Sequence, residues 1–308
     1  MLTSSSPSSL PSSRNAALFT LSDFTRALTE NDSALSSYAT AEHTEKFHLL
    51  TEEMLRVNRY MNITAITEIP DILVKHYADC AMIVPYIPKN AVLCDVGCGG
   101  GFPTLPIAIL RPDVNIVAVD STQKKLDYVK NTAALLGLNN VTVQASRAES
   151  LGCNPTFRET FDFVTARAVA RMNVLCEWCL PLVKPGGLFL AMKGKNGASE
   201  HAEAAHAISI LGGETLFCRE KLLVSPFDAD TEIPAAKSTD QTIFTQGVEN
   251  DSDEKISSQK IPKPVDTART DAKQDEEAMR RCLILIRKIK QTPKQYPRNN
   301  AQITKKPL

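Results

Sequence analysis

The sequence contains a glycine-rich turn whose spacing suits a ligand bound through the backbone. It reads Asp95-Val-Gly97-Cys-Gly99-Gly100-Gly101 and ends the apolar residues 91–96. Glycines at such a turn let the chain bend tightly and approach a ligand that a Cβ atom would exclude. A dinucleotide fingerprint, G-x-G-x-x-G, needs a glycine where Phe102 stands, and the Gly-Lys-Ser/Thr of a phosphate-binding loop is missing. The turn therefore excludes a P-loop enzyme and leaves a nicotinamide enzyme as a second choice.

The spacing D-x-G-x-G-x-G is the pattern that S-adenosylmethionine-dependent methyltransferases of the Rossmann-like class use. Asp120 ends the next apolar run, 19 residues after Gly101, where a carboxylate can accept hydrogen bonds from both ribose hydroxyls. Arg147-Ala148-Glu149 follows the third apolar run, where such folds line the adenine. Any one of these features can be a plain turn or a helix cap. Their order over three successive runs predicts S-adenosylmethionine as the cofactor.

The residues after the fourth apolar run exclude several methyl acceptors. Methylation of an exocyclic amino group generally needs an Asn/Asp-Pro-Pro-aromatic tetrad, and the chain has Thr165-Ala-Arg167 there. Methylation of a pyrimidine at C5 needs a nucleophilic cysteine. The nearest cysteine, Cys176, lies in an amphipathic stretch and is interpreted as helix core. Catechol-type O-methylation needs carboxylates that hold a divalent metal, and no such cluster is apparent, so no metal is expected.

Basic residues stand at the ends of the third, fourth and fifth apolar runs. They are Arg147, Arg167 and Lys193, which suit recognition of guanine or phosphate. Guanine N7 carries a lone pair and no proton, so an in-line displacement at a sulfonium methyl needs no general base. Positioning alone can lower a barrier by about 7–11 kcal/mol. The pattern fits an N7 acceptor, although these arginines could instead pair with carboxylates such as Asp95 or Glu149.

The elements that position these residues alternate along the chain. Short apolar runs predict seven strands, and helical segments such as 102–112 and 121–138 separate the first of them. The predicted strands cover residues 91–96, 115–120, 141–146, 161–168, 188–194, 215–225 and 281–291. This alternation is typical of an α/β fold with a mostly parallel seven-stranded sheet. The predicted fold class is the Rossmann-like class I methyltransferase fold.

The flanking segments differ in composition. We expect residues 1–40 to be a disordered Ser/Pro-rich tail and residues 41–90 to form an N-terminal helical cap. The methyltransferase domain is expected over 91–225 and 278–308. Residues 226–277 carry 13 acidic and 6 basic groups and are expected to be an acidic, disordered insertion.

The formal net charge of the 308 residues is zero, but it is a sum of unlike parts. Residues 226–277 carry −7, residues 278–308 carry +9, and the remaining residues carry −2. Neutrality therefore does not argue against an RNA partner. No apolar run is long enough to span a membrane. Cys176 and Cys179 have the CxxC spacing without a second pair, so we expect buried, reduced cysteines and a cytoplasmic protein. No heptad pattern suggests more than a monomer.

Seven short motifs occur in the order in which the RsmG (GidB) family has them. They are Asn58-Arg-Tyr-Met-Asn62-Ile-Thr64, Lys75-His76-x-x-Asp79, DVGCGGGFP from Asp95, Ser146-Arg-Ala-Glu149, Ala166-Arg-Ala168, Met-Lys193-Gly194 and Tyr296-Pro-Arg298. The chain resembles this family over about residues 42–225 and 279–308. The resemblance implies a bacterial enzyme that methylates N7 of a guanine in 16S ribosomal RNA, equivalent to guanine 527, on the RNA or the small ribosomal subunit.

The resemblance also implies roles for individual residues. Those expected to bind the cofactor are Gly97, Gly99, Gly101, Phe102, Asp120, Ala148, Glu149 and Arg167. Those expected to position the guanine or the RNA are Asn62, His76, Arg147, Lys193 and Arg298. His76 could equally be a satisfied core histidine, and Asn62 a turn residue. The chain departs from the family pattern at Cys80, at Thr104 and in the acidic insertion.

Two other hypotheses stay open from the sequence alone. The cofactor half could serve a methyltransferase that acts on a small molecule or a protein. The chain could also be a non-catalytic assembly factor that uses its basic end. RNA binding through phosphates would weaken with salt, whereas binding of a small acceptor would not.

Overall fold

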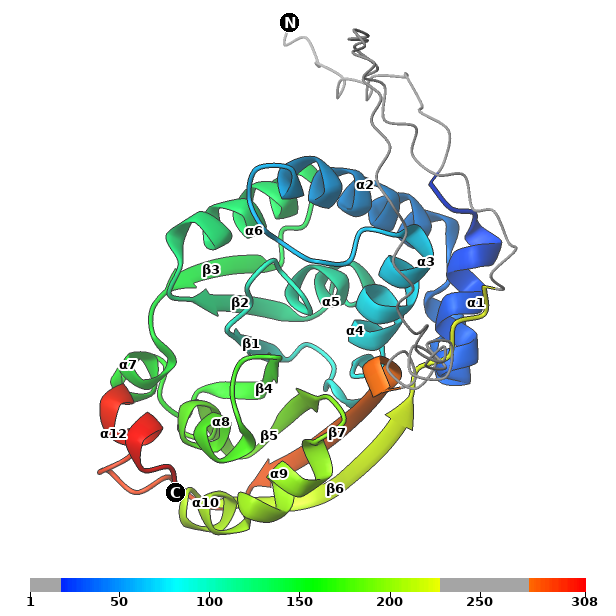
Figure 1. The fold of residues 1–308 in the computed structure, drawn as a ribbon. Helices are drawn as coiled ribbons and strands as arrows, with labels where there is room; N and C mark the ends of the chain where they lie inside the picture. Colours follow the sequence, from blue (N-terminus) through cyan, green and yellow to red (C-terminus); the bar gives the residue numbers. More distant parts are fainter. Residues whose placement is uncertain (1–17, 228–276) are drawn as a thin grey trace, which may run out of the picture.

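The computed structural model describes residues 18–227 and 277–308, in which helices cover both faces of one central sheet (Figure 1). The strands are β1 (Val92–Val96), β2 (Asn115–Asp120), β3 (Val141–Ala145), β4 (Phe161–Arg167), β5 (Val183–Lys193), β6 (Gly213–Leu222) and β7 (Arg280–Lys288). The α-helices that surround the sheet are α1 (Leu21–Asn31), α2 (Ala41–Asn58), α5 (Thr104–Leu110), α6 (Gln123–Leu135), α7 (Ala148–Cys153), α8 (Met172–Cys179), α9 (Gly197–Glu203), α10 (Ala205–Ile210) and α12 (Asn300–Lys305). The other helical segments are η1 (Ser33–Tyr38), α3 (Ile69–Asp71), η2 (Ile72–Ala78), α4 (Asp79–Ala81) and η3 (Val84–Tyr86).

The strand order is β3-β2-β1-β4-β5-β7-β6, and the first five strands of the chain run parallel. β7 lies between β5 and β6 and is antiparallel to both. Lys193, the last residue of β5, pairs with Cys282 near the start of β7. The start of β7 therefore lies at the same edge of the sheet as the carboxyl ends of the parallel strands. The predicted fold class, a mostly parallel seven-stranded class I methyltransferase sheet, is confirmed.

Alternation along the strands divides the core in two. On β1 and β4, Leu93 and Phe163 belong to one apolar cluster, whereas Cys94 and Val164 belong to the other. The first cluster packs under α5, α6 and the N-terminal helices, and the second under α8 and α10. Strands buried on both faces read as continuous apolar runs, which is why the sequence pattern located them.

The expectation of a disordered tail over residues 1–40 was wrong for residues 18–40, and residues 1–17 lie outside the described residues. α1 begins with a capping box in which Thr20 accepts from the Asp23 amide and Asp23 accepts from the Thr20 amide. Phe24 and Leu28, four residues apart, are fully buried in the same cluster as the sheet. The sequence prediction missed this amphipathic helix because it assigned all of residues 1–40 from their Ser/Pro-rich composition.

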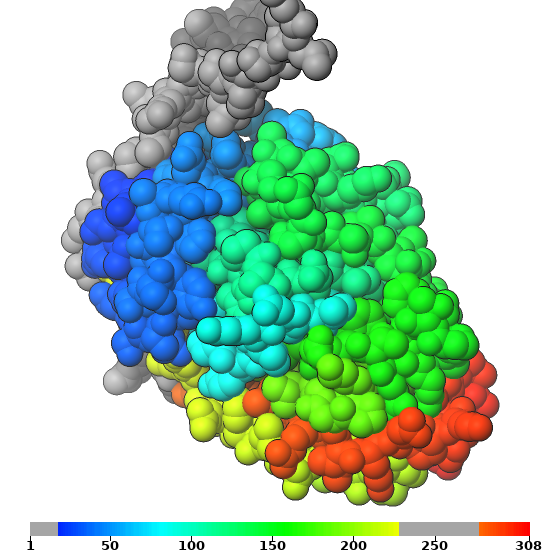
Figure 2. Space-filling model, turned by 180° about the vertical axis from the view of Figure 1, so that it is seen from behind, coloured from blue at the N-terminus to red at the C-terminus, as the bar shows by residue number. Residues whose placement is uncertain are grey.

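Residues 41–90 are mostly helical and pack directly against the sheet. Phe47 of α2 and Tyr77 of η2 are fully buried, with ring centroids 4.5 Å apart. In the space-filling view, the blue N-terminal segment lies against the teal and green of the sheet region (Figure 2). The helical segments therefore share one core with the strands. In the described part of the chain, no helix is long and apolar enough to cross a membrane.

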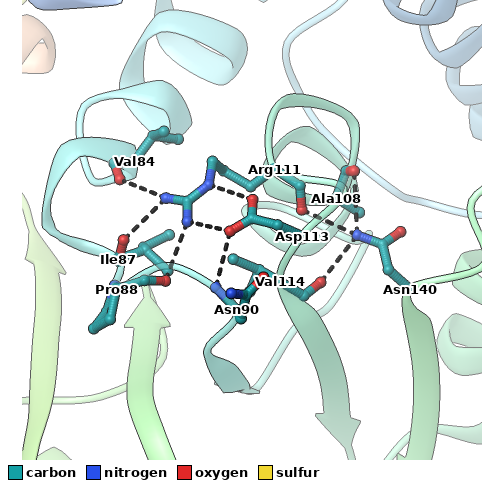
Figure 3. Close-up of polar contacts among 9 residues, drawn as sticks. All are labelled: Val84, Ile87, Pro88, Asn90, Ala108, Arg111, Asp113, Val114 and Asn140. Atoms are coloured by element: carbon teal, nitrogen blue, oxygen red, sulfur yellow. Dashed lines mark hydrogen bonds and ion pairs between the residues drawn. The ribbon is translucent and has the colours of Figure 1, made fainter.

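The segments that precede β1, β2 and β3 are joined to one another through the side chains of Arg111, Asp113 and Asn140 (Figure 3). The Arg111 guanidinium donates to the carbonyl oxygens of Ile87 and Pro88, at 2.9 and 3.1 Å, and pairs with both carboxylate oxygens of Asp113 at 2.7 Å. On the other side, the Asn140 amide donates to the Val114 carbonyl at 3.0 Å. This cluster lies at the edge of the sheet opposite the glycine-rich turn.

The described chain stops at Phe227 and resumes at Glu277, so the predicted acidic insertion lies almost entirely outside the described residues. Its preceding segment is held by α1, because the Asn31 side chain exchanges two 2.9 Å hydrogen bonds with the Val224 backbone. On the returning side, the Leu223 amide donates to the Met279 carbonyl at 2.9 Å.

Candidate functional site

The glycine-rich turn joins β1 to α5 at the carboxyl edge of the sheet. Gly97, Gly99 and Gly101 have φ values of +75°, +54° and +83°, which favour glycine. The Gly97 and Cys98 amides both donate to the Val119 carbonyl, at 2.8 and 3.0 Å. The turn is thereby folded against the end of β2, next to Asp120.

Gly97 and Gly101 differ in the neighbours that a side chain at each position would meet. A Cβ atom on Gly97 would lie 2.8 Å from the Val169 side chain, and one on Gly101 would lie 2.7 Å from the Leu105 side chain. Gly97 lines a cavity, but Gly101 allows α5 to pack closely on the turn. A cofactor role for Gly101 is therefore indirect, through the shape of the turn.

A cavity that we call the first cavity lies at the carboxyl ends of β1, β2 and β3. It is lined by Val96, Gly97, Val119, Asp120, Ser121, Ser146, Arg147, Ala148, Glu149, Val169, Trp178 and Asn300. Five predicted site residues meet there, namely Gly97, Asp120, Arg147, Ala148 and Glu149. Four of these were expected on the cofactor side. The fifth, Arg147, was expected on the guanine side, and it is exposed at the start of α7.

The Asp120 carboxylate is oriented by two backbone amides. The Gly99 amide donates to Oδ2 at 3.0 Å, and the Thr122 amide donates to Oδ1 at 2.8 Å. Each oxygen keeps a lone pair for a further donor. A fixed carboxylate of this kind can accept hydrogen bonds from vicinal hydroxyl groups, as the sequence predicts for the ribose.

A second cavity lies farther along the same edge, at the ends of β4 and β5. It is lined by Ile66, Lys75, Asp79, Arg167, Ala168, Met192, Lys193, Gly194 and Arg281. Arg167 and Lys193 were predicted site residues, and Asp79 and Arg281 were not. Lys193 Nζ pairs with Glu200 at 2.8 Å. Four basic side chains against one lining carboxylate make the second cavity a basic site.

A buried polar network holds Arg167 in place. Arg167 Nη1 donates to Asp79 Oδ2 at 2.8 Å, and Nη2 donates to His76 Nδ1 at 3.0 Å. His76 Nε2 lies 2.8 Å from Thr64 Oγ1, so the tautomer with a proton on Nε2 donates to Thr64. The sequence left open a pairing of these basic residues with Asp95 or Glu149, and the carboxylate that pairs with Arg167 is that of Asp79.

The imidazole of His76 is neutral. Burial and the neighbouring charges of Arg167 and Arg281 lower its pKa to about 3. Both ring nitrogens are engaged, and the ring stacks on Phe102 at 4.4 Å between centroids. His76 therefore lies in the wall beside the second cavity as a positioning residue. Phe102 packs in this wall and is 7% exposed.

Asp95, at the end of β1, lies behind the turn. Its Oδ2 accepts from Thr104 Oγ1 at 2.6 Å, and its Oδ1 is buried without a hydrogen-bond partner among the described residues. Burial raises the pKa of Asp95 to about 6, against the lowering effect of the Thr104 hydrogen bond. With Asp120 and Glu149, Asp95 gives this side of the edge a negative potential that suits a positively charged ligand such as a sulfonium.

Two predicted residues lie apart from these walls. Asn62 is exposed in the loop between α2 and α3, next to Ile63, which packs on Gly100. Arg298 is held by the buried Glu177, to which its Nε and Nη2 donate at 2.8 and 2.6 Å. It thus anchors the C-terminal segment to α8, and neither cavity lining includes it.

Sequence reasoning missed three residues that shape the site. Asn58 folds the loop before α3 by accepting from the Ile63 and Thr64 amides, at 2.8 and 3.0 Å. Asp79 joins Arg167 to Arg281, a residue 202 positions away in the chain. Asn58 and Asp79 both stood in motifs that carry the family resemblance. Arg281 had no local signal beyond its place at the start of a strand.

Two observations limit the kinds of catalytic group that the described residues provide. Within 18–227 and 277–308, no group of three or more His, Cys, Asp or Glu side chains could hold a metal ion. Cys176 and Cys179 are buried in α8, and burial raises the pKa of both thiols above the usual range, so neither is a ready nucleophile. What the edge offers is a carboxylate-lined first cavity beside a basic second cavity.

Comparison with known proteins identifies a family. The family model described as rRNA small subunit methyltransferase G matches residues 43–224. A ribosomal RNA small subunit methyltransferase G from Lactobacillus delbrueckii subsp. bulgaricus is 42% identical over 207 residues, covering 66% of this chain and 85% of the relative. One from Oceanobacillus iheyensis is 36% identical over 287 residues, covering 92% of this chain and 98% of the relative. A solved SAM-dependent O-methyltransferase from Thermotoga maritima is 12% identical, with a TM-score of 0.44 over 78% of this chain and 72% of that one.

Proposed function

The chain belongs to the rRNA small subunit methyltransferase G family and is an S-adenosylmethionine-dependent methyltransferase of small-subunit ribosomal RNA; on that premise we propose that it methylates N7 of one guanine in 16S ribosomal RNA, equivalent to guanine 527. The reaction would be an in-line displacement without a general base. The observation that carries this proposal is the contrast between the two cavities, one lined by carboxylates and the other by basic side chains.

The first cavity fits the cofactor. Asp120, held by two backbone amides, would accept from the ribose, and Ala148 and Glu149 would line the adenine. Gly97 lets the backbone approach the ligand, and the unpartnered Asp95 Oδ1 offers negative charge behind the turn. When bound, S-adenosylmethionine supplies an electrophilic methyl group on a sulfonium.

The second cavity supports an acceptor that loses no proton in the attacking step. The side chains around it are fixed cations, a buried carboxylate paired with two arginines, and a neutral histidine whose nitrogens are both engaged. None of these is poised as a general base. Guanine N7 attacks with its lone pair, so orientation of the base can provide the catalysis. Lys193 carries N–H donors that suit the guanine O6 edge.

The remaining site assignments are proposals of the same kind. Gly99, Gly101, Phe102 and Arg167 would shape the cofactor side, and Asn62, His76, Arg147 and Arg298 the guanine or RNA side. We also propose that residues 41–90 act as a cap on a methyltransferase domain of residues 91–225 and 278–308. The protein would work as a cytoplasmic monomer on 16S RNA or the small subunit.

Nucleoside analysis of 16S RNA tests the proposal directly. RNA from a strain that lacks the gene should have lost one N7-methylguanine, and purified protein with labelled S-adenosylmethionine should restore it to small subunits from that strain. Retention of every N7-methylguanine in the deletion strain would refute the N7 assignment. Transfer of label to another atom of the RNA would refute it while leaving the family activity intact.

A further inference from the structure

Arg281 lies at the catalytic edge although it comes from the far end of the chain. It is the second residue of β7, whose start is level with the end of β5 because Cys282 pairs with Lys193. Its side chain lines the second cavity together with Arg167 and Lys193. The antiparallel insertion of β7 thus brings an additional guanidinium to a site otherwise built from the ends of β4 and β5 and from residues 66–79.

Asp79 holds two arginines at once. Its Oδ2 accepts from Arg167 at 2.8 Å, and its Oδ1 accepts from Arg281 Nε at 3.0 Å, while the residue itself is 3% exposed. Asp79 is thus shared between two cations, Asp95 acts on Arg167 as well, and the neutral His76 adds no charge. Lys75 and Lys193 each have a partner, in Asp71 and Glu200. Arg281 therefore shares its carboxylate with a second arginine in a partly desolvated position, 17% exposed, where charge-assisted hydrogen bonds are strong.

The surface is also hollowed next to the second cavity. Two further hollows adjoin the second cavity, one lined by Gly194, Lys195, Glu277, Ala278, Arg280 and Arg281, the other by Glu220, Lys221, Leu222, Arg280 and Arg281. Arg281 lines all three hollows. A sugar–phosphate backbone that leaves the second cavity along this edge would pass it.

The position of Arg281 favours a phosphate over the guanine base. β7 is three strands from β1 in the sheet, roughly 14 Å at about 4.8 Å per strand. Arg167, on the strand next to β1, is the nearer arginine to the first cavity, and its Nη atoms are already bonded to Asp79 and His76. Arg281 keeps Nη2 without a hydrogen-bond partner among the described residues, and a guanidinium matches phosphate oxygens well.

We propose that Arg281 binds a backbone phosphate of the ribosomal RNA next to the target guanine, and that Asp79 aligns Arg281 with Arg167 for this purpose. The proposal rests on the proposed function, since it assigns a substrate contact within that site. Arg281 would be a substrate-binding residue and Asp79 a positioning residue.

The test compares R281Q with R287Q, a matched control on the same strand. Arg287 is half exposed, pairs with Glu214, and pairs in the sheet with Leu188, five residues before the end of β5. Binding to small subunits from the deletion strain is measured between 50 and 200 mM KCl, together with kcat, KM and the Kd for S-adenosylmethionine. For R281Q we expect KM to rise about tenfold, and the log–log salt slope to fall by about 0.7, as for one lost phosphate contact. The kcat and the cofactor Kd should stay within about twofold, and R287Q should match the wild type.

R281K separates a substrate contact from a structural role. A lysine keeps the positive charge but not the planar fork, so it should restore the salt slope while KM stays raised. An unchanged slope in R281Q would overturn the proposal, as would an equal loss in R287Q. Loss of cofactor binding or of thermal stability in both Arg281 variants, without a change of slope, would assign Arg281 to the fold alone. If the wild type transfers no methyl group to the RNA, it is the proposed function that fails.

Discussion

At the scale of single residues, the environment of Asp120 supports the proposed contact of its carboxylate with the ribose. Both of its oxygens are aligned by backbone amides, from Gly99 in the turn and from Thr122 before α6. The carboxylate needs no reorganisation to receive two hydroxyl groups. Pre-alignment of this kind reduces the entropic cost of binding.

We therefore expect D120A to weaken cofactor binding strongly. The loss of charge-assisted hydrogen bonds, each of about 1.5–3 kcal/mol, should raise the Kd for S-adenosylmethionine by about tenfold to hundredfold for each bond lost. Isothermal titration calorimetry measures it. D127A is the control, because Asp127 is exposed on the neighbouring α6 and, among the described residues, accepts only from Gln123. Equal affinities of D120A and D127A would contradict the assignment of Asp120.

His76 makes a prediction about pH. Its pKa is about 3 in the folded protein, below its ordinary value of 6.5, so the folded state binds fewer protons than the unfolded state between these two pH values. The free energy of unfolding should consequently fall as the pH drops below 6.5. Between pH 6.5 and 5 the loss due to His76 is about 2 kcal/mol.

Urea titrations of the wild type and H76Q at pH 5 to 7 measure this term by difference. Asp95 acts in the opposite direction, because its pKa of about 6 lies above the ordinary 3.8, and its contribution is lost as the pH rises through 6. Asp95 is present in both proteins, so the difference isolates His76. Parallel pH dependences of the two proteins would mean that His76 titrates normally.

At the scale of elements, the molecule separates its two edges. The carboxyl edge holds both cavities, whereas the amino edge is closed by the Arg111 cluster, which joins the segment after α4 to the sheet (Figure 3). Arg111 is 8% exposed and Asp113 shares both oxygens with it. The amino edge can therefore be altered without touching the site.

R111M should lower the free energy of unfolding by about 2–4 kcal/mol, since it removes the guanidinium donors of several buried carbonyl groups and leaves Asp113 with the Asn90 amide as its donor. The Arg111 hydrogen bonds hold the pKa of Asp113 well below its usual range. This stabilisation is present above the ordinary pKa of 3.8 and is lost as the pH falls below it, so the difference between R111M and the wild type should shrink in acid.

R56M is the matched control on the surface of α2, where Arg56 pairs with Glu53 and is 60% exposed. It should change the stability by less than about 1 kcal/mol. Folded R111M should bind S-adenosylmethionine as the wild type does. A cofactor Kd that rises in step with the loss of stability would show that the two edges are coupled.

The sequence predicted those elements whose own residues form a recognisable local pattern. The strand runs and the turn at Gly97 were located because buried parallel strands and glycines with positive φ leave local patterns. α1 was missed because its four buried residues follow a polar, Ser/Pro-rich segment. The pairing of Asp79 with Arg281 could not be predicted, since it depends on β7 inserting antiparallel beside β5. Lys193 and Arg167 were located correctly at strand ends, but Arg298 is held by Glu177 through a contact that no spacing indicates.

At the scale of the whole molecule, an acidic segment of the chain joins the fold at the edge that would meet the RNA. The described ends on either side of residues 228–276 are close together, because Leu222 pairs with Arg280 in the sheet and Leu223 bonds to Met279. Those 49 residues carry a net charge of −6 in a chain whose total is zero. They enter and leave the fold next to the basic hollows around Arg281.

Replacing residues 228–276 by a Gly/Ser linker of about ten residues should leave the fold intact, because such a linker spans roughly 17 Å on average. The Kd for S-adenosylmethionine should be unchanged. Affinity for small subunits should rise severalfold at 50 mM KCl, since removal of −6 reduces repulsion of the RNA, and this gain should fade by 300 mM as salt screens it. A second variant of wild-type length, in which six of the twelve acidic residues of this segment are changed to Asn or Gln, brings the charge of the segment to zero and should behave alike. If only the shortened protein gains affinity, length rather than charge is responsible, and the electrostatic explanation fails.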